Sequence, residues 1–388
     1  MGDGDDFKMP VTYPHWGSVT YVLESLLREL KMKDIMPPIK PTKHTAELGA
    51  RYGPEFICTP FKLTLGTFIE MLDKGADQLA MGGCNSFCRF GYYWPVQKLI
   101  LEDLGYDFKF FHVDYESPRM LLKNLKEASG GLNTLQTIRA LQVTWLKNRL
   151  TDLTDEMLFK YRALEIEKGV TDRLAQKMFR KIVETKGVCN IRRLHRELPK
   201  IFEKEINIKK EKNVLKVAVC GEIYAVIEPA LNLDVHRKLN ELGVICESTA
   251  TLTRFSDVPR VLNPFYQMHW QKARELGRPY VANRIGGETM ENLGDIIQYK
   301  QEGWDGLVHI YPFTCMPEII TRAIAPQLSK ENDMPFLSLV VDEHTGEAGF
   351  QTRIEAFIDL LRRRKQEKLS KTKNRNEKFT ESEMGVYV

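Results

Sequence analysis

The sequence predicts an α/β protein. Short apolar runs alternate with segments of helical periodicity in residues 1–118 and again in 213–365. Such alternation is typical of parallel strands connected by crossover helices. Between these parts, residues 119–212 have helical periodicity and few strand signals. We therefore expect two Rossmann-like parallel-sheet lobes joined by a helical connector, followed by a basic flexible tail at 366–388.

In the first lobe, the first expected element is a helix over residues 17–31, where apolar residues from Val19 to Leu30 recur at helical spacing. Pro37-Pro38 ends that unit, because proline cannot continue a helix. The remaining expected elements are a short strand at 56–57, a helix over 61–72, a strand at 78–81, a helix over 93–104 and a strand at 108–113.

In the connector, apolar stripes such as Leu135, Ile138 and Leu141 indicate helices, and Gly169, Gly187 and Pro199 are expected to punctuate them. The second lobe opens at 214–220, a continuous apolar run typical of a central parallel strand. The elements expected after it are a helix over 234–242, a strand at 244–246, strands at 307–311 and 336–341, and a closing helix over 350–363.

The formal net charge of +4 is unevenly distributed. Residues 362–378 hold 9 basic and 2 acidic side chains, which leaves 47 basic and 50 acidic side chains elsewhere. A near-neutral body lacks the basic face of a nucleic-acid-binding domain. We expect the tail to be solvated, with docking to an acidic partner as the alternative.

The sequence also bears on location. No apolar run reaches the length of a membrane-spanning helix, and the acidic N-terminus lacks the apolar stretch of a secretory signal. We therefore expect a cytoplasmic protein with no membrane partner. Its seven cysteines would stay reduced there, so they do not imply disulfides.

Three cysteines, Cys58, Cys88 and Cys315, each follow a predicted strand. Ligands bind at the carboxyl ends of strands in open α/β sheets. Thiolates that converge there predict a soft-metal site, for which iron–sulfur clusters and zinc are the leading candidates. Cys84 is either a fourth ligand or a spare, and Gly82-Gly83 beside it permit a close backbone approach.

Alternatives remain at this point. The paired C-x-x-C spacing that is common in zinc sites is absent. A free cysteine often serves only as a small buried hydrophobe, and this is the role expected of the cysteines outside the candidate site. These are Cys189, Cys220 and Cys246.

Residues near the three cysteines have two interpretations each. Arg89 could donate hydrogen bonds to cluster sulfides, which tune the reduction potential, or form an ordinary ion pair. Glu318 could donate a proton or complement a helix dipole. Gly286-Gly287 could approach a phosphate, and the 342–344 segment could act on substrate or simply lead into the closing helix.

Longer motifs resemble a known family, the CoA-substrate-specific enzyme activase-related proteins. These are relatives of 2-hydroxyacyl-CoA dehydratase subunits and double-cubane cluster proteins. The resemblance covers most of residues 10–365. The motifs that carry it are Cys58-Thr-Pro-Phe-Lys-Leu-Thr-Leu-Gly66, Lys74-Gly-Ala-Asp77, Cys88-Arg-Phe-Gly-Tyr-Tyr93, Cys315-Met-Pro-Glu318, Asp342-Glu-His-Thr-Gly-Glu-Ala-Gly349 and Thr352-Arg-Ile-Glu-Ala-Phe357.

The resemblance implies a cluster held by three cysteines, which by position are Cys58, Cys88 and Cys315, with Cys84 as a less direct match. The cluster would be a [4Fe-4S] cubane or a sulfide-bridged double cubane. Such proteins receive low-potential electrons from a separate ATP-hydrolysing activator. This chain has no G-x-x-x-x-G-K-[ST] loop, so we expect ATP hydrolysis to belong to that partner. The helical middle departs from the dehydratase pattern.

The function expected from these observations is that of an oxygen-sensitive reductase or a 2-hydroxyacyl-CoA dehydratase-like component. A second copy of the chain or a paralogous subunit could complete it. Two alternatives come from other classes: a non-catalytic cluster carrier or assembly protein, and a zinc-stapled interaction protein. An enzyme needs an accessible iron, whereas a carrier can have that position capped, for instance by Cys84.

Overall fold

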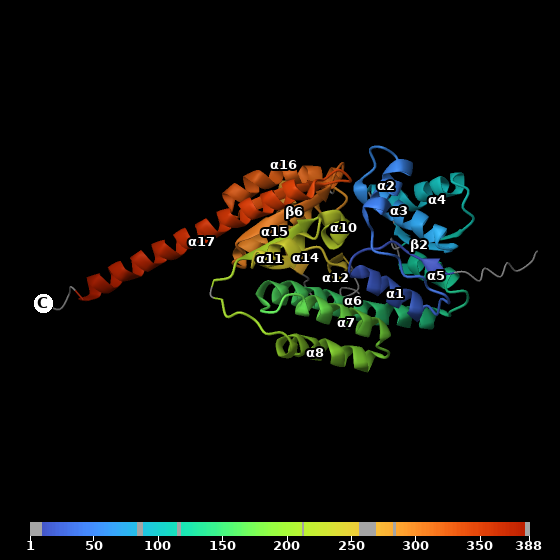
Figure 1. The fold of residues 1–388 in the computed structure, drawn as a ribbon, viewed down its shortest axis with the longest axis horizontal. Coiled ribbons are helices and arrows are strands. Elements are labelled where there is room, and N and C mark those ends of the chain that lie inside the picture. Colours follow the sequence, from blue (N-terminus) through green and yellow to red (C-terminus); the bar gives the residue numbers. More distant parts are fainter. Residues whose placement is uncertain are drawn as a thin grey trace, which may run out of the picture.

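Two parallel sheets organise the chain (Figure 1). The computed structural model describes residues 10–83, 88–114, 118–211, 213–255, 269–281 and 285–384. One sheet has three strands in the order β1-β2-β3, and the other has four in the order β5-β4-β6-β7. The strands are β1 (Val11–Thr12), β2 (Gln78–Gly83), β3 (Lys109–Asp114), β4 (Lys216–Gly221), β5 (Ile245–Ser248), β6 (Gly306–Pro312) and β7 (Phe336–Val341). Every pair is parallel, so the predicted α/β class is confirmed.

The helices expected over 17–31, 61–72 and 93–104 are present, a helix over 43–52 was not expected, and one expected strand is missing. The 56–57 run is irregular rather than extended. The edge beside β2 is taken instead by β1, with Val11 opposite Gln78. Phe56 is 70% exposed, so these two apolar residues bury too little surface to hold a strand. The helices of this part are α1 (Val19–Glu29), α2 (Lys43–Tyr52), α3 (Thr59–Asp73), η1 (Arg89–Tyr92) and α4 (Tyr93–Asp103).

The connector is helical, as predicted. It consists of α5 (Pro118–Ala128), α6 (Thr134–Leu164), α7 (Val170–Glu184) and α8 (Val188–Glu205). Gly169 and Gly187 are the residues at which α7 and α8 begin. Pro199 was expected to end a helix, but it lies inside α8. Leu194, Leu198 and other residues of α8 are buried in the helical core, and this packing outweighs the local cost of proline.

Helices α6, α7 and α8 form a layer along the bottom of the molecule in Figure 1, whereas α5 packs against β3 of the first sheet. The long helix α6 contacts α1 of the first part and also β5 and α11 (Val235–Glu241) of the second. It therefore packs against both parts of the chain rather than serving only as a link. None of the helices in the described residues is long and apolar enough to cross a membrane.

The second sheet is covered by helices on both faces, because β4 and β6 bury residues into two separate cores. As predicted, β4 is central, with β5 on one side and β6 on the other. The helices here are α9 (Ile223–Ile227), α10 (Pro229–Asn232), α11 (Val235–Glu241), α12 (Leu252–Phe255), α14 (His269–Gly277), η2 (Arg278–Tyr280), α15 (Thr289–Gln301), α16 (Met316–Glu331) and α17 (Glu347–Met384).

The structure differs from the flexible tail expected over residues 366–388. Rather than becoming irregular near residue 366, α17 continues to Met384 and projects from the body as a single helix (Figure 1). Its first turns are anchored, since Ile354, Ile358 and Leu361 are buried. The extension is rich in lysine, arginine and glutamate, which are strong helix formers even without packing.

Candidate functional site

The three predicted cysteines occupy equivalent positions, because each is the residue at which a helix begins. Cys58 precedes α3, Cys88 precedes η1 and Cys315 precedes α16. Cys58 and Cys315 are each 7% exposed and Cys88 is partly buried. The N-terminus of a helix carries partial positive charge. The long helices α3 and α16 therefore favour negative charge on the Cys58 and Cys315 sulfurs.

Arg89 ties the three cysteine segments together. Its Nη1 donates to the main-chain oxygen of Phe56 at 3.0 Å, two residues before Cys58. Its Nη2 donates to the main-chain oxygen of Thr314, directly before Cys315. The Thr314 hydroxyl also donates to the Phe56 oxygen at 3.2 Å. The structure thus gives Arg89 partners in the neighbouring loops, where sequence reasoning expected cluster sulfides or an ion pair.

An aromatic wall covers the Cys58 side of the site. The Tyr93 hydroxyl lies 2.5 Å from the Cys58 Sγ and is buried with it. Phe61 and Phe90 contact the Tyr93 ring edge to face, with centroids 5.1 and 5.3 Å away. These rings exclude water from this side of the site.

Burial is the main cause that raises the pKa of each of the three thiols. It raises the pKa of Cys88 to about 12, and the pKa of Cys58 and of Cys315 also rises. The negative charge of the Glu222 carboxylate raises the pKa of all three thiols further. Protonated thiols are poor nucleophiles, whereas a bound cation would displace their protons. The donor set therefore suits a metal centre better than nucleophilic catalysis.

Two glutamates that sequence reasoning missed raise the pKa of the cysteine thiols by their charge, Glu222 for all three and Glu288 for Cys88 and Cys315. Glu222 precedes α9 and Glu288 precedes α15. Burial raises the pKa of Glu222 to about 7. Burial, then Glu222 and Glu318, raises the pKa of Glu288 well above its usual range. The position of Glu222 directly after the predicted central strand was the one signal in the sequence that could have identified it.

The backbone at the end of β4 fixes the position of Glu222 between β6 and α15. Gly221 has a φ of +137°, and a side chain there would overlap the Ile310 oxygen of β6. Because Gly221 has no side chain, the Glu222 main-chain N–H can donate to the Ile310 oxygen at 3.1 Å. The Asn292 side chain accepts from the Gly221 N–H at 3.1 Å. The turn is therefore held between β6 and α15.

Glu318 and His309 are fully buried and belong to one hydrogen-bond network. Its Oε2 contacts the Nε2 of His309 at 2.7 Å and accepts from Asn292 at 2.9 Å. The Nδ1 of His309 contacts the Ser338 hydroxyl at 2.9 Å. Within the described residues, the other carboxylate oxygen of Glu318 has no hydrogen-bond partner. Side chains on α15 and β6 therefore hold Glu318 in place. This is a role that neither sequence interpretation, proton donor or complement to a helix dipole, included.

Two other sequence candidates have structural roles. Gly287, with a φ of +77°, packs so closely against Pro317 of α16 that a side chain there would overlap it. Asp342 accepts from the His344 N–H at 2.9 Å and closes the turn before α17. Glu343 forms an ion pair at 2.5 Å with Lys62 of α3.

The strand order places this site where ligands bind in open sheets. β4 has β5 on one side and β6 on the other, so the chain reverses direction across the sheet at β4 and β6. Ligands occupy the crevice outside the carboxyl ends of strands at such a point. Glu222 follows β4 and Cys315 follows β6 by three residues. The cysteine site therefore lies at the crevice that the topology creates.

Exposed apolar side chains flank the three cysteines in sequence. Large apolar side chains are normally buried, and a group of exposed ones marks an interaction surface. Arg89 holds their segments together. We call this group the apolar rim, and it consists of Phe56, Tyr92, Phe313, Met316 and Ile319.

The site does not resemble a single-ion site. Within the described residues, no three side chains of His, Cys, Asp or Glu come close enough together to hold one metal ion. A cubane has different requirements, because each of its thiolate ligands binds a different iron. Cys84 lies outside the described residues. Cys220 and Cys246 are buried, as expected, whereas Cys189 is exposed, so the prediction of a buried hydrophobe is wrong for Cys189. The Cys246 sulfur accepts a hydrogen bond from the Asn240 side chain.

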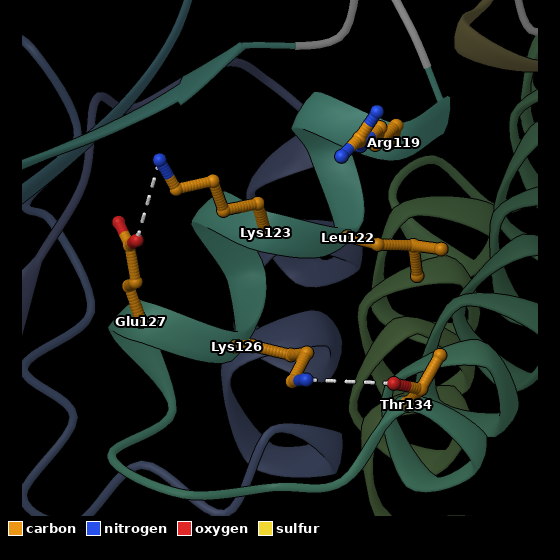
Figure 2. Close-up of a pocket in the computed structure, with 6 residues that line it drawn as sticks. All are labelled: Arg119, Leu122, Lys123, Lys126, Glu127 and Thr134. Atoms are coloured by element: carbon orange, nitrogen blue, oxygen red, sulfur yellow. Dashed lines mark hydrogen bonds and ion pairs between the residues drawn. The ribbon is translucent and has the colours of Figure 1, made fainter.

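A surface groove on α5 is formed by other residues. It has a volume of about 390 Å³ and is drawn in Figure 2. Lys123 pairs with Glu127 at 3.9 Å, and Lys126 donates to Thr134 at 3.4 Å. The residues that line it are Arg119, Leu122, Lys123, Lys126, Glu127 and Thr134. None comes from the cysteine segments.

A comparison with protein-family models and with curated proteins finds no match for this chain.

Proposed function

We propose that this chain is an iron–sulfur protein whose cluster is held by Cys58, Cys88 and Cys315. The observation that carries the proposal is the hydrogen bonding of Arg89, next to Cys88, to the segments before the other two cysteines. Those segments lie far apart in the sequence, and nothing in the local structure requires them to meet. We place the chain with the activase-related relatives of 2-hydroxyacyl-CoA dehydratases, with two Rossmann-like lobes around the cluster.

The donor set fits a cluster in three respects. The thiols are buried and protonated when free, so they need a cation to become thiolates. The N-termini of α3 and α16 stabilise the resulting negative charge. The ring of Tyr93 and its neighbours limit access of water. The bound cluster would supply one-electron chemistry, and Arg89 would act as a positioning residue for its ligands.

The reaction we propose is that of a reductase or dehydratase-like component that accepts low-potential electrons. The donor would be a separate ATP-hydrolysing protein, because this chain has no phosphate-binding loop. The apolar rim offers a docking surface at the mouth of the site. The protein would work in the cytoplasm, where thiols stay reduced.

Anaerobic purification with iron and sulfide analysis and electron paramagnetic resonance tests the cluster directly. Cys58→Ser, Cys88→Ser and Cys315→Ser should each abolish the visible chromophore and the bound iron. Cys189→Ser and Cys246→Ser are the matched controls and should retain both. Wild-type iron content in all five variants would show that the cluster assignment is wrong.

The energy source has its own test. The purified chain alone should not hydrolyse ATP, and reduction of its cluster should require a donor protein together with ATP. Sustained ATP turnover by the isolated chain, unaffected by removal of trace contaminants, would rule out the separate donor. A chain that holds its cluster but reduces no substrate with the donor present would instead favour the cluster-carrier alternative.

A further inference from the structure

We propose that the Tyr93 hydroxyl raises the reduction potential of the cluster that the three cysteines would hold, by donating a hydrogen bond to the Cys58 sulfur. This role rests on the proposed function and deepens it, because it gives one side chain control over how easily the cluster accepts an electron. Tyr93 acts through Cys58, so it is a positioning residue and not a ligand.

The hydroxyl and the sulfur are in direct contact. The Tyr93 oxygen lies 2.5 Å from the Cys58 Sγ, and the two residues are buried, with exposed fractions of 3% and 7%. While the thiol keeps its proton, either group can be the donor. Burial of both residues keeps solvent from competing for this hydrogen bond.

The direction of the hydrogen bond follows from the charge of the sulfur. A cysteine that binds a metal does so as a thiolate, which has no proton left to donate. The Cys58 sulfur can then only accept. A phenol has an ordinary pKa of about 10 and keeps its proton at neutral pH, so Tyr93 is the donor once Cys58 is a ligand.

Packing holds the hydroxyl against the sulfur. Phe61 lies one turn after Cys58 on α3, and its ring contacts the Tyr93 ring edge to face with centroids 5.1 Å apart. One turn after Tyr93 on α4, the buried Gln97 side chain donates to the Phe61 main-chain oxygen at 3.1 Å and to the Thr64 hydroxyl at 2.8 Å. These contacts fasten α4 to α3 beside Cys58 and orient the Tyr93 ring.

A hydrogen bond to a ligand sulfur makes a cluster easier to reduce. Reduction adds one electron, and the sulfur atoms share the added negative charge. A donor binds a more negative acceptor more strongly, so the Tyr93 hydrogen bond stabilises the reduced state more than the oxidised state. Hydrogen bonds to sulfur are among the factors that set cluster potentials. Tyr93 keeps its proton throughout, and no covalent bond forms or breaks at its oxygen.

The hydroxyl of Tyr93 differs in kind from the donors at the other two cysteines. The main chain of Phe90 hydrogen-bonds Cys88, and the main chain of Glu318 hydrogen-bonds Cys315. A main-chain donor remains when a side chain is replaced, whereas the Tyr93 hydroxyl can be removed without moving the backbone. A substitution at position 93 therefore isolates the effect of one hydrogen bond on the potential.

The test is an anaerobic redox titration of the loaded wild-type and Tyr93→Phe proteins, followed by electron paramagnetic resonance. Tyr93→Phe retains the ring that packs on Phe61 and removes only the hydroxyl. Tyr106→Phe is the matched control, because the Tyr106 hydroxyl donates to Asp73 at 2.7 Å at the other end of α3. Bound iron and sulfide are measured in each protein, so that equally loaded proteins are compared.

We expect Tyr93→Phe to bind the cluster and to be harder to reduce than the wild type. At a fixed potential, its ratio of oxidised to reduced cluster should be at least about threefold higher, because a hydrogen bond to a charged sulfur is lost. Tyr106→Phe should titrate as wild type. A merely structural role for Tyr93 would change stability or iron content and leave the potential unmoved, so an unchanged potential in loaded Tyr93→Phe would overturn the proposal.

A stronger donor at the same position tests the opposite change. Ring-fluorinated tyrosine in place of Tyr93 has nearly the shape of tyrosine, and its more acidic phenol donates more strongly. The potential should rise above that of the wild type, and an equal value would overturn the proposal even if Tyr93→Phe holds no cluster.

The same experiments separate this inference from the proposed function. If the wild-type protein binds no iron, both fail together. If the wild type binds iron and neither change at position 93 moves the potential, the proposed function stands and the role given to Tyr93 is wrong.

Discussion

The guanidinium of Arg89 donates a hydrogen bond to the main-chain oxygen of Phe56 at 3.0 Å. This contact joins the residue after one candidate ligand to the loop before another. The same side chain also reaches the main-chain oxygen of Thr314, 225 positions away. One arginine therefore sets the spacing of three segments that have no local reason to approach one another.

Arg89→Lys should lower the iron affinity of the site much more than it lowers the free energy of unfolding. A lysine ammonium is a point charge and cannot hold two separated carbonyls in the way a planar guanidinium does. We expect iron affinity to fall by about 10–100-fold, as for other partners of metal ligands. The free energy of unfolding should change by only about 1 kcal/mol, because Arg89 is exposed.

Arg173→Lys is a suitable control, since Arg173 is also exposed and pairs with Glu167 on the helical layer. Iron titration of the reconstituted proteins gives the iron affinity, and urea unfolding of the metal-free proteins gives the free energy of unfolding. Unchanged iron affinity in Arg89→Lys would show that the loops hold their positions without this side chain.

The Lys62–Glu343 ion pair should link the first α/β part to the end of β7. The two groups are 2.5 Å apart and mostly buried, with exposed fractions of 9% and 17%. Lys62→Met leaves the carboxylate without its partner, so we expect a loss of about 1.5–3 kcal/mol in the free energy of unfolding. A double-mutant cycle with Glu343→Gln measures the coupling.

The exposed Lys43–Glu47 pair on α2 is the matched comparison. Exposed pairs of this kind contribute about 0.3–0.5 kcal/mol. A coupling energy for Lys62–Glu343 no larger than that of Lys43–Glu47 would contradict the role given to this pair.

His236 should destabilise the fold at acid pH. Burial, with a smaller effect of the Arg162 charge, lowers the pKa of His236 to about 3. The unfolded chain binds this proton near pH 6.5, whereas the folded chain resists it. The contribution to stability is therefore complete above pH 6.5 and is lost as the pH falls toward 3. At pH 4.5 the loss should be on the order of 2 kcal/mol.

His236→Phe retains a ring that can stack on Phe159, whose centroid lies 4.2 Å from that of His236, but it binds no proton. Urea unfolding of both proteins from pH 7 to pH 4 should show the wild type losing stability more steeply. Parallel curves would mean that His236 remains neutral in both states or is not buried as described.

Truncation of α17 should separate its anchored part from its projecting part. Lys365 pairs with Asp305 at 2.8 Å and Lys368 pairs with Asp333 at 3.1 Å. Removing residues 371–388 should change the free energy of unfolding by no more than about 0.5 kcal/mol, as for surface changes generally. Thermal unfolding and iron content measure the effect.

The charge of the helix needs a separate variant, because residues 371–388 hold four basic and three acidic side chains and their removal hardly changes the net charge. If the basic run from Arg362 onward speeds encounter with an acidic donor protein, replacing Lys371, Lys373, Arg375 and Lys378 with glutamine should slow reduction at low salt, and the difference should fade at high salt. A truncated protein that loses its cluster or unfolds would show that the projecting part packs on the body.

Local patterns in the sequence were sufficient for most elements. The apolar run of β4 predicted a central strand, and β4 is central. Helical spacing from Val19 onward predicted α1, and the glycines at 169 and 187 marked the starts of α7 and α8. These signals succeed because a period of 3.6 residues or an uninterrupted buried run is a property of a short stretch of chain.

The predictions that were wrong concern features that depend on contacts between distant parts of the chain or on several effects at once. Nothing local shows that β1 rather than the 56–57 run would lie beside β2, since an edge strand needs a neighbour to pair with. Pro199 lies within α8 because a buried face elsewhere on that helix outweighs its local cost. The end of α17 depends on helix propensity, which a composition argument for disorder did not weigh.

The sequence by itself identified Cys58, Cys88 and Cys315 as candidate ligands, because each follows a predicted strand and lies in a distinctive motif. Only the tertiary structure decided that Arg89 joins their segments and that the charge of Glu222 raises the pKa of all three thiols. The physical reason is that these interactions act through space. Hydrogen bonds and charge act over a few ångströms between residues more than 200 positions apart, and strand order and the ends of strands bring those residues together.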